Sequence, residues 1–316
     1  MTQPHGADAA GPGRLRPGVA LPFFWRRIRG SLRPRPGAAP AVPFVPAALE
    51  RNPALTWVGH ATFYVRLDGA AFLTDPVYSE LASPLPFAGP KRLVPPGVPL
   101  DAFPRLDFAL LSHDHYDHTD LPTVRRLARR GVPFVVPTGL GELVRRAGGR
   151  VAAELGWWQH ARVAGVTVTC VPARHFSGRG LADRNQRLWA GFVVAGETRR
   201  FYHSGDTGLF DGFARIGRHA GPIDLACLPV GAYEPRAMMG PIHLNPEEAV
   251  RAALDLDARA AVAMHFGTFD LSDQHDAFGD PMPGADGPFR RTRAADDRGV
   301  GYLPVSFLWV GRLPNE

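Results

Sequence analysis

The sequence contains little cysteine, and this scarcity excludes several classes of protein. Only two cysteines occur among 316 residues, and both lie in short apolar segments, residues 166–171 and 225–230. Cysteines inside buried strands are usually reduced packing residues, so Cys170 and Cys227 argue against a disulfide framework. Neither cysteine has the spacing of a metal ligand. A metal site in this protein would therefore be built from other side chains.

A long apolar segment is also missing. Residues 19–25 are apolar but number only seven and include Pro22. Such a run is too short to span a membrane, and no convincing cleavage site for secretion accompanies it. We therefore expect a cytoplasmic protein, with peripheral contact at the inner face of the membrane as an additional option.

The third absence is a net charge on the main body of the chain. The formal charge of the whole sequence is +6. Residues 1–54 hold eight arginines against two acidic residues, which accounts for the entire excess. A nucleic-acid-binding protein needs a basic track across its body. We therefore expect no nucleic-acid partner.

The N-terminal region differs from the rest in composition. Residues 1–52 are rich in glycine, proline and arginine, which predicts a basic arm, and residues 53–316 are predicted to form one domain. Within residues 23–29, aromatic and cationic side chains alternate as they do in segments that contact a membrane surface, although the rings could instead dock on the domain. The side chains concerned are Phe23, Phe24, Trp25, Arg26, Arg27 and Arg29.

What the sequence does contain is a dense group of histidines and aspartates. The group follows a short apolar strand and precedes a segment with helical spacing, so it occupies a strand-to-helix turn. Its pattern is H-x-H-x-D-H, formed by His113, His115, Asp117 and His118. Imidazole and carboxylate are ligands of zinc, with iron and manganese as competitors. The alternative is a solvated loop, but unpaired polar groups beside a core strand would be costly to bury.

Three more candidate ligands, His175, Asp206 and His265, each come shortly after another short apolar run. Together with the first group they make five histidines and two aspartates, enough for two ions with open positions for water. The predicted strands are residues 56–67, 71–74, 108–111, 133–136, 166–171, 192–194, 200–202, 225–230 and 260–264, and the predicted helices are residues 121–130, 141–146 and one that begins at 246.

Two further residues are expected beside this site. Asp75 directly follows a predicted strand, where its carboxylate could orient a ligand histidine through a hydrogen bond. Asn245 and Pro246 are signals for the start of a helix. They place His243 just ahead of the positively polarised helix N-terminus.

Taken together, these features resemble the metallo-β-lactamase superfamily. Within it they are most similar to the branch of N-acylphosphatidylethanolamine-hydrolysing phospholipase D and its bacterial relatives. The resemblance runs from about residue 55 to residue 281. Besides the group at residues 112–120, it rests on TWVGHAT at 56–62, LTDP at 73–76, GPKR at 89–92, SGDTG at 204–208, VGAYEPR at 230–236, PEEAV at 246–250 and HFGTF at 265–269.

The resemblance implies an α/β protein with a four-layer αβ/βα sandwich and a two-zinc site at one edge. It also implies that Asp75 supports a ligand from behind, that His243 faces the substrate phosphate and that Tyr116 lines the cleft. The implied ligands are His113, His115 and His175 for one zinc, Asp117, His118 and His265 for the other, and Asp206 as the bridge between them.

The implied activity is a phosphodiesterase of phospholipase D type that acts on N-acylphosphatidylethanolamine-like phospholipids. A metal-bridging hydroxide would attack phosphorus. Asp117 and Asp206 would hold the ions, and His243 would hydrogen-bond the phosphate or protonate the leaving alkoxide. Two departures touch the cleft: Ile242 stands where the resemblance expects glutamine, and residues 237–240 are small and apolar where it expects an aromatic.

Alternatives to this activity remain open at the level of the sequence. The same fold supports lactonases that act on sugar-phosphate lactones and other ester or amide hydrolases, and fold alone does not separate these chemistries. A non-catalytic zinc-binding protein, tethered through its basic arm, is an alternative of a different class. Related enzymes can form homodimers, so a homodimer is also an option for this chain.

Overall fold

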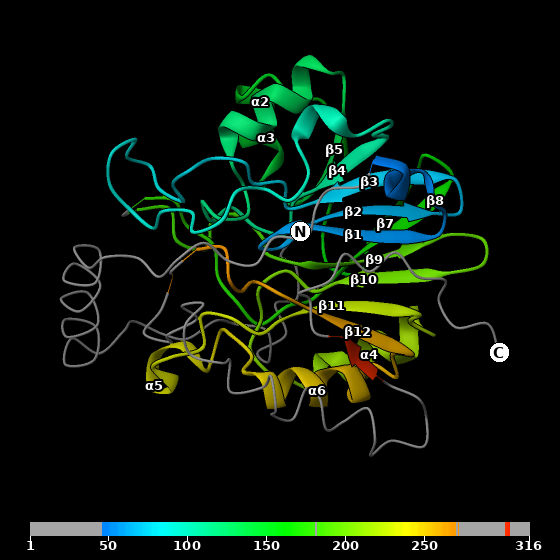
Figure 1. The fold of residues 1–316 in the computed structure, drawn as a ribbon. Coiled ribbons are helices and arrows are strands. Elements are labelled where there is room, and N and C mark those ends of the chain that lie inside the picture. Colours follow the sequence, from blue (N-terminus) through cyan, green and yellow to red (C-terminus); the bar gives the residue numbers. More distant parts are fainter. Residues whose placement is uncertain (1–45, 181, 270, 272–300, 304–316) are drawn as a thin grey trace.

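Two β-sheets lie face to face at the centre of the structure, a computed structural model that describes residues 46–180, 182–269, 271 and 301–303 (Figure 1). In both sheets the order of the strands across the sheet follows their order along the chain. The first sheet contains β1 (Ala54–Gly59), β2 (Thr62–Leu67), β3 (Ala70–Thr74), β4 (Phe108–Leu110), β5 (Phe134–Pro137) and β6 (Val151–Leu155). The second contains β7 (His160–Val163), β8 (Val166–Val171), β9 (Gly191–Ala195), β10 (Arg200–His203), β11 (Leu225–Pro229), β12 (Ala260–Met264) and β13 (Gly301–Leu303).

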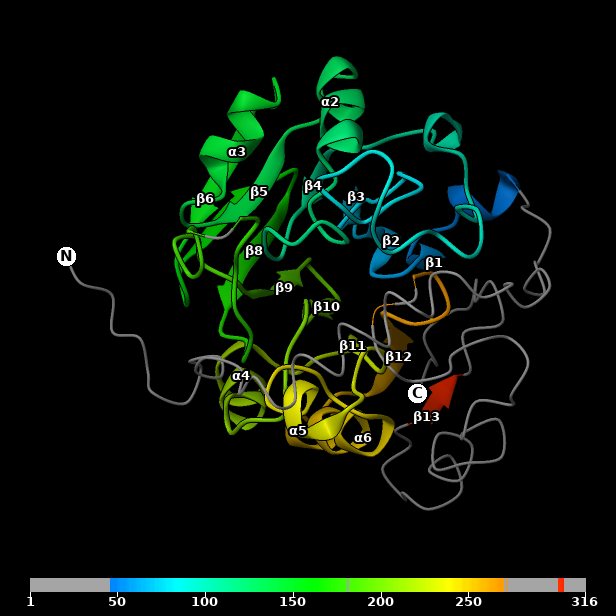
Figure 2. The same ribbon diagram turned by 90° about the vertical axis from the view of Figure 1, so that its left-hand side faces the viewer.

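Helices cover the outer face of each sheet. Figure 2 shows α2 (Leu121–Arg129) and α3 (Gly141–Arg146) beside the first sheet, and α4 (Gly212–Ala220) and α6 (Pro246–Asp255) beside the second. The resulting order of helices, sheet, sheet and helices confirms the predicted four-layer α/β sandwich. The short elements are η2 (Pro46–Glu50), η3 (Leu100–Ala102) and α5 (Arg236–Met239).

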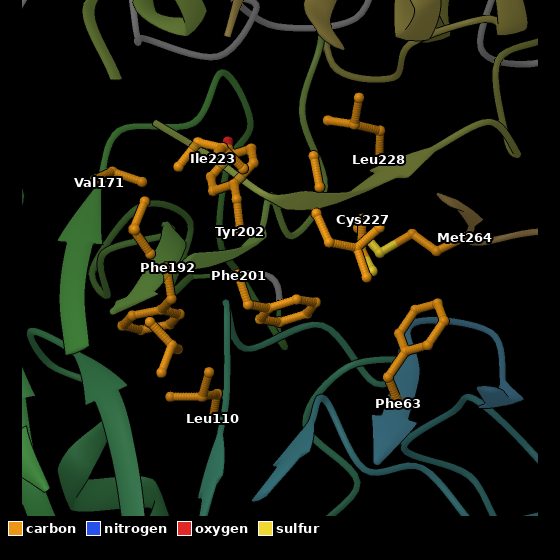
Figure 3. Close-up of a cluster of buried hydrophobic side chains, with 14 of the residues drawn as sticks. Phe63, Leu110, Val171, Phe192, Phe201, Tyr202, Ile223, Cys227, Leu228 and Met264 are labelled. Atoms are coloured by element: carbon orange, nitrogen blue, oxygen red, sulfur yellow. The ribbon is translucent and has the colours of Figure 1, made fainter. Parts of the chain in front are cut away.

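The central strands β3, β4 and β5 of the first sheet are almost entirely apolar and buried because both of their faces are covered. Along β3, Phe72 points into the core between the sheets and Leu73 points towards α2 and α3. The Phe72 ring lies 4.7 Å from the ring of Phe108 and 5.9 Å from that of Phe201 in the second sheet. Figure 3 shows the same core, where side chains of the two sheets meet.

Parallel pairing brings several strand ends to the same edge of the sandwich. In the first sheet β3 and β4 are parallel, and in the second β10, β11 and β12 are parallel. The carboxyl ends of neighbouring parallel strands lie side by side, so the loops that follow them are neighbours too. Strand β8 is antiparallel to β9, as β10 is, so its carboxyl end also lies at this edge. The candidate ligands stand in the loops after β4, β8, β10 and β12.

One predicted strand is wrong. Residues 56–67 do not form a single strand, because the chain reverses after Gly59 and separates β1 from β2. Gly59 has a φ of 139° and His60 a φ of 55°, which are backbone values outside the range of a strand. The sequence prediction also missed β6 and β7. Both are only partly buried, so their side chains lack a strong apolar signal.

The two cysteines confirm their predicted role. Cys170 and Cys227 are free and buried, and each lies in a strand of the second sheet. Burial raises the pKa of both thiols. They are packing residues of the core.

Most of the predicted N-terminal arm lies outside the described residues. The six aromatic and cationic residues between positions 23 and 29 are among those outside, so contact with a membrane through them stays a prediction, as does the division of the chain at residue 52. Among the described residues, no helix is long and apolar enough to cross a membrane.

Helix α6 should depend measurably on its N-terminal cap. Asn245 Oδ1 accepts a hydrogen bond of 2.8 Å from the backbone N–H of Glu248, whose carboxylate accepts one of 3.0 Å from the backbone N–H of Asn245. The Asn245→Ala variant should lose about 1 kcal/mol in the free energy of unfolding, measured in urea. The control is Glu247→Ala, an exposed change in the same turn, which should stay within about 0.5 kcal/mol. Equal losses in both variants would contradict this role of the cap.

Candidate metal centre

The candidate ligands come from four loops that follow strands. The group at residues 113–118 follows β4, and the other three candidates follow β8, β10 and β12. The structure brings all of them together at one edge of the sandwich. The three that are distant in sequence from the main group are His175, Asp206 and His265.

Three histidines form the first group of possible ligands. His115 Nδ1 lies 2.9 Å from His113 Nε2 and 3.2 Å from His175 Nε2. Ligands about 2.0–2.1 Å from a tetrahedral zinc ion are about 3.3 Å apart. The three ring nitrogens therefore have the spacing of ligands to one ion.

A second group lies next to the first. Asp117 Oδ2 is 3.2 Å from His265 Nε2 and 3.6 Å from His118 Nε2. These distances are again close to those between the ligands of one ion. The second group therefore combines two imidazoles with a carboxylate.

Asp206 lies between the two groups. Its Oδ1 is 3.2 Å from His118 Nε2, and its Oδ2 is 3.1 Å from His265 Nε2, both in the second group. Towards the first group, Oδ2 is 3.7 Å from His175 Nε2 and 3.9 Å from His113 Nε2. One carboxylate thus faces both groups.

The charges in this cluster depend on one another. Burial opposes the charge of the Asp206 carboxylate, but His118, His265 and His243 around it hold its pKa well below the usual range. Burial likewise opposes the charge of His118, yet its carboxylate neighbours raise its pKa well above the ordinary value. Burial opposes the charge of His265, and Asp206 and Asp117 raise its pKa to about 9. By contrast, burial lowers the pKa of His113 well below its ordinary value.

The inward-facing atoms fit a cation better than they fit one another. His118 Nε2 and Asp206 Oδ1 are both buried, and although they lie 3.2 Å apart, neither makes a hydrogen bond of good geometry with the other or with another described residue. A buried polar atom without a partner costs about 1–3 kcal/mol. A divalent cation would supply the missing partner to both atoms. Imidazole with carboxylate is a donor set of zinc, and iron and manganese accept it as well.

Asp75 organises the centre from behind. Its carboxylate accepts hydrogen bonds from Ser112 N and Ser112 Oγ, both 2.7 Å long, from His118 Nδ1 at 2.8 Å and from His203 Nε2 at 2.9 Å. Burial alone would raise the pKa of this carboxyl group, but the two histidines lower it overall. Because His118 Nδ1–H donates to Asp75, Nε2 faces inward, and once it has lost the proton that the neighbouring carboxylates favour, its lone pair is available to a cation.

The same tautomer follows for two other histidines. Ser112 Oγ donates to Asp75, so it accepts the Nδ1–H of His113 at 2.9 Å. His175 Nδ1–H donates to the backbone oxygen of Ile242 at 3.1 Å. In each case the Nε2 lone pair faces the centre, which is the arrangement of histidines that bind a metal.

His243 and Tyr116 lie at the border of the centre. His243 is buried, and its Nδ1 is 3.9 Å from Asp206 Oδ2. Burial lowers the pKa of His243 to about 4. The Tyr116 hydroxyl donates to the backbone oxygen of Arg179 at 2.9 Å, and the Arg179 guanidinium lies 3.8 Å from the centre of the Tyr116 ring.

Two histidines of the centre were not among the sequence-predicted site residues. His203 Nε2 donates to Asp75, as described above, and it stands three residues before Asp206. His60 Nε2 lies 3.0 Å from Asp117 Oδ2. The only signal for His60 was its place within the TWVGHAT segment, where a histidine interrupts an otherwise apolar run.

The chain is similar to a family of known proteins. Residues 71–266 match the family described as Beta-lactamase superfamily domain. The N-acyl-phosphatidylethanolamine-hydrolyzing phospholipase D 1 of Caenorhabditis elegans is 44% identical over 228 residues, which are 68% of this chain and 64% of that protein. The mitochondrial N-acyl-phosphatidylethanolamine-hydrolyzing phospholipase D of Saccharomyces cerevisiae is 34% identical over 245 residues, 73% of this chain and 52% of that protein.

The matched region covers less than two thirds of the length of either relative. Among solved structures, the isothiocyanate hydrolase from Delia radicum gut bacteria has a TM-score of 0.57 at 20% sequence identity, covering 81% of this chain and 99% of that chain. At this identity the likeness shows a shared fold.

Removal of the Asp75 charge should weaken the second group of ligands. In the Asp75→Asn variant, His118 loses the anionic acceptor that fixes its tautomer, so zinc affinity at the second group should fall about 10- to 100-fold. Titration of metal-free protein with zinc against a competing chelator measures this change. Asp101→Asn, a change at an exposed carboxylate, is the control. Wild-type affinity in Asp75→Asn protein of intact fold would refute this role of Asp75.

Proposed function

This chain belongs to the β-lactamase superfamily domain family, and from that premise we propose that it is a two-metal phosphodiesterase of phospholipase D type. Its proposed substrates are N-acylphosphatidylethanolamine-like phospholipids. The position of Asp206 carries the proposal, because one carboxylate lies within 3.9 Å of histidines from both ligand groups. Phosphodiester hydrolysis commonly uses such a pair of ions.

Two zinc ions would be held by seven side chains of this centre. When bound, such ions lower the pKa of a coordinated water from 15.7 to about 7 and neutralise charge on a transferring phosphoryl group. The two aspartates bring negative charge to the centre, and the inward nitrogen lone pairs complete the ligand set. The proposed ligands are His113, His115 and His175 for one ion, Asp117, His118 and His265 for the other, and Asp206 for both.

The relatives support the proposed substrate class. Two proteins named for the hydrolysis of N-acyl-phosphatidylethanolamine are 44% and 34% identical to this chain over more than two thirds of its length. Because the match leaves more than a third of each relative uncovered, their substrate is a proposal for this chain.

Apolar side chains near the centre and on the loop before η3 suit a lipid. Tyr116, which stands between two candidate ligands, packs against one small apolar cluster, and Leu271 joins this cluster to another. The loop between β3 and η3, which contributes to the first cluster, also exposes Leu85 by 47% and Phe87 by 81%. Acyl chains could contact the exposed side chains of Leu85 and Phe87 while the phosphate reaches the metals. The buried members of the two clusters are Val77, Ala82, Phe269, Ala232, Met238 and Met239.

His243 is proposed to hydrogen-bond the substrate phosphate. Its backbone is fixed on both sides, since its N–H donates to Met239 O at 2.8 Å and its oxygen accepts from Arg236 Nη1 at 3.1 Å. Its Nδ1 is buried beside Asp206 and has no hydrogen-bond partner among the described residues. A phosphate at the centre would give this nitrogen a partner and hold the substrate in place for attack.

The proposal is tested by chelation and substrate choice. Wild-type protein should hydrolyse both N-acylphosphatidylethanolamine and bis(p-nitrophenyl) phosphate, lose both activities when its metals are removed, and regain them with zinc. Unchanged hydrolysis after complete chelation would contradict the metal mechanism. Hydrolysis of the activated diester alone would contradict the proposed phospholipid substrate but would still support metal-dependent phosphodiester hydrolysis.

The His243→Ala variant should retain its metals but lose activity. Loss of a residue that positions or protonates the phosphodiester should lower kcat/KM for the phospholipid about 100-fold. The activated diester has a better leaving group, so a smaller loss for it would indicate proton donation, and an equal loss would indicate hydrogen bonding. His219→Ala, at an exposed histidine, is the matched control. Turnover of both substrates within about twofold of wild type would remove His243 from the proposed site.

A further inference from the structure

His60 enters the metal centre from the turn between β1 and β2. The side chain is buried, with 1% of the residue exposed, although histidine is polar and the turn contains no other charged group. Its φ of 55° is uncommon for a residue other than glycine. Strained backbone of this kind persists only where the surroundings hold it.

One nearby and two distant residues hold the His60 backbone. Its N–H donates to Thr268 Oγ1 at 2.7 Å. Its oxygen accepts a hydrogen bond of 3.0 Å from Trp57 Nε1 and one of 3.2 Å from the backbone N–H of His265. The turn of the first sheet is thereby joined to the loop after β12, which carries a candidate ligand.

The His60 side chain is aimed at Asp117. Nε2 lies 3.0 Å from Asp117 Oδ2, the oxygen that also faces His118 and His265. The His60 ring centre is 4.1 Å from that of His265, and its ring edge packs against Phe269. The imidazole is therefore oriented so that Nε2 can make a hydrogen bond to Asp117.

The free nitrogen of His60 identifies the tautomer. Nδ1 is buried without a hydrogen-bond partner among the described residues. A proton on Nδ1 would leave a buried donor unsatisfied and would place two lone pairs, those of Nε2 and Asp117, against each other. A proton on Nε2 instead gives the carboxylate a donor.

The contacts of Nε2 argue against a direct metal bond. His118 Nε2 and His265 Nε2 face Asp117 and also lie within 3.2 Å of Asp206, the residue between the two ligand groups. Among the described residues, Asp117 is the one carboxylate within 4.0 Å of His60 Nε2. The geometry of His60 is that of a donor to a ligand.

We propose that His60 is a positioning residue for the second metal position: its Nε2–H donates to Asp117 and fixes the orientation of that carboxylate. This inference rests on the two-metal function proposed above. Without the donor, Asp117 would be free to rotate away from His118 and His265. His113, His115 and His175 do not contact the Asp117 carboxylate. Loss of the His60 donor should therefore leave the ion of this first group bound.

Two substitutions separate the donor from the backbone conformation. Asparagine tolerates positive φ well, but its shorter side chain does not reach Asp117, so His60→Asn removes the donor. Glutamine places an amide N–H close to the position of Nε2, so His60→Gln keeps a donor. His219→Asn, at an exposed histidine, controls for the exchange of residue type.

Metal-free full-length proteins are titrated with zinc against a competing chelator, and with cobalt(II) while the absorption spectrum is recorded. Wild type should bind two ions. His60→Asn should bind the second ion about 10- to 100-fold more weakly and the first ion with unchanged affinity. His60→Gln should recover most of the lost affinity and keep the wild-type cobalt spectrum. Thermal unfolding of each metal-free variant is measured in parallel, since a purely structural residue would lower the stability without affecting one ion selectively.

The outcomes distinguish this inference from the function on which it rests. Two ions bound equally well by wild type and His60→Asn would overturn the positioning role alone. Weak binding by both variants, with an imidazole lost from the cobalt spectrum of each, would overturn it by showing that His60 is itself a ligand. A folded wild-type protein that binds no ion would overturn the proposed function and this inference together.

Discussion

The structure depends on a carboxylate that is buried among histidines. Asp206 exposes 4% of its surface, and five imidazoles have a nitrogen within 3.9 Å of its oxygens. An isolated charge in such a place would be costly to bury. The histidines stabilise the Asp206 anion. Outer hydrogen bonds of His113, His118 and His175 direct their Nε2 atoms towards it. A metal cation would bind both the carboxylate and these nitrogens, so it would stabilise the whole buried cluster.

In this sandwich, polar residues stand directly after buried apolar strands, and this arrangement gathers them at one edge. Core strands such as β3 and β4 are buried on both faces and fix the positions at which their loops begin. Asp75, the first residue after β3, then gathers Ser112, His118 and His203 around one carboxylate. Two packed sheets thus hold the candidate ligands in place, which is the condition for a preorganised site.

Much of this arrangement follows from the sequence, because local patterns carry it. The apolar runs identify most of the core strands, and the histidines after residue 112 have a spacing that few other functions require. The turn at Gly59 and His60 could not be predicted in this way. Its positive φ values are held by Thr268 and His265, more than 200 residues away in the chain. Strands β6 and β7 were not predicted for a different reason: both are only partly buried, and their sequences give no strong apolar signal.

The space around Asp206 is the proposed site of two ions, and crystallography can test this directly. Anomalous diffraction from crystals of the zinc-loaded protein should show two peaks about 3.5–4 Å apart. One should lie among His113, His115 and His175, and the other beside Asp117, with Asp206 between them. A single peak, or none near Asp206, would contradict the central claim.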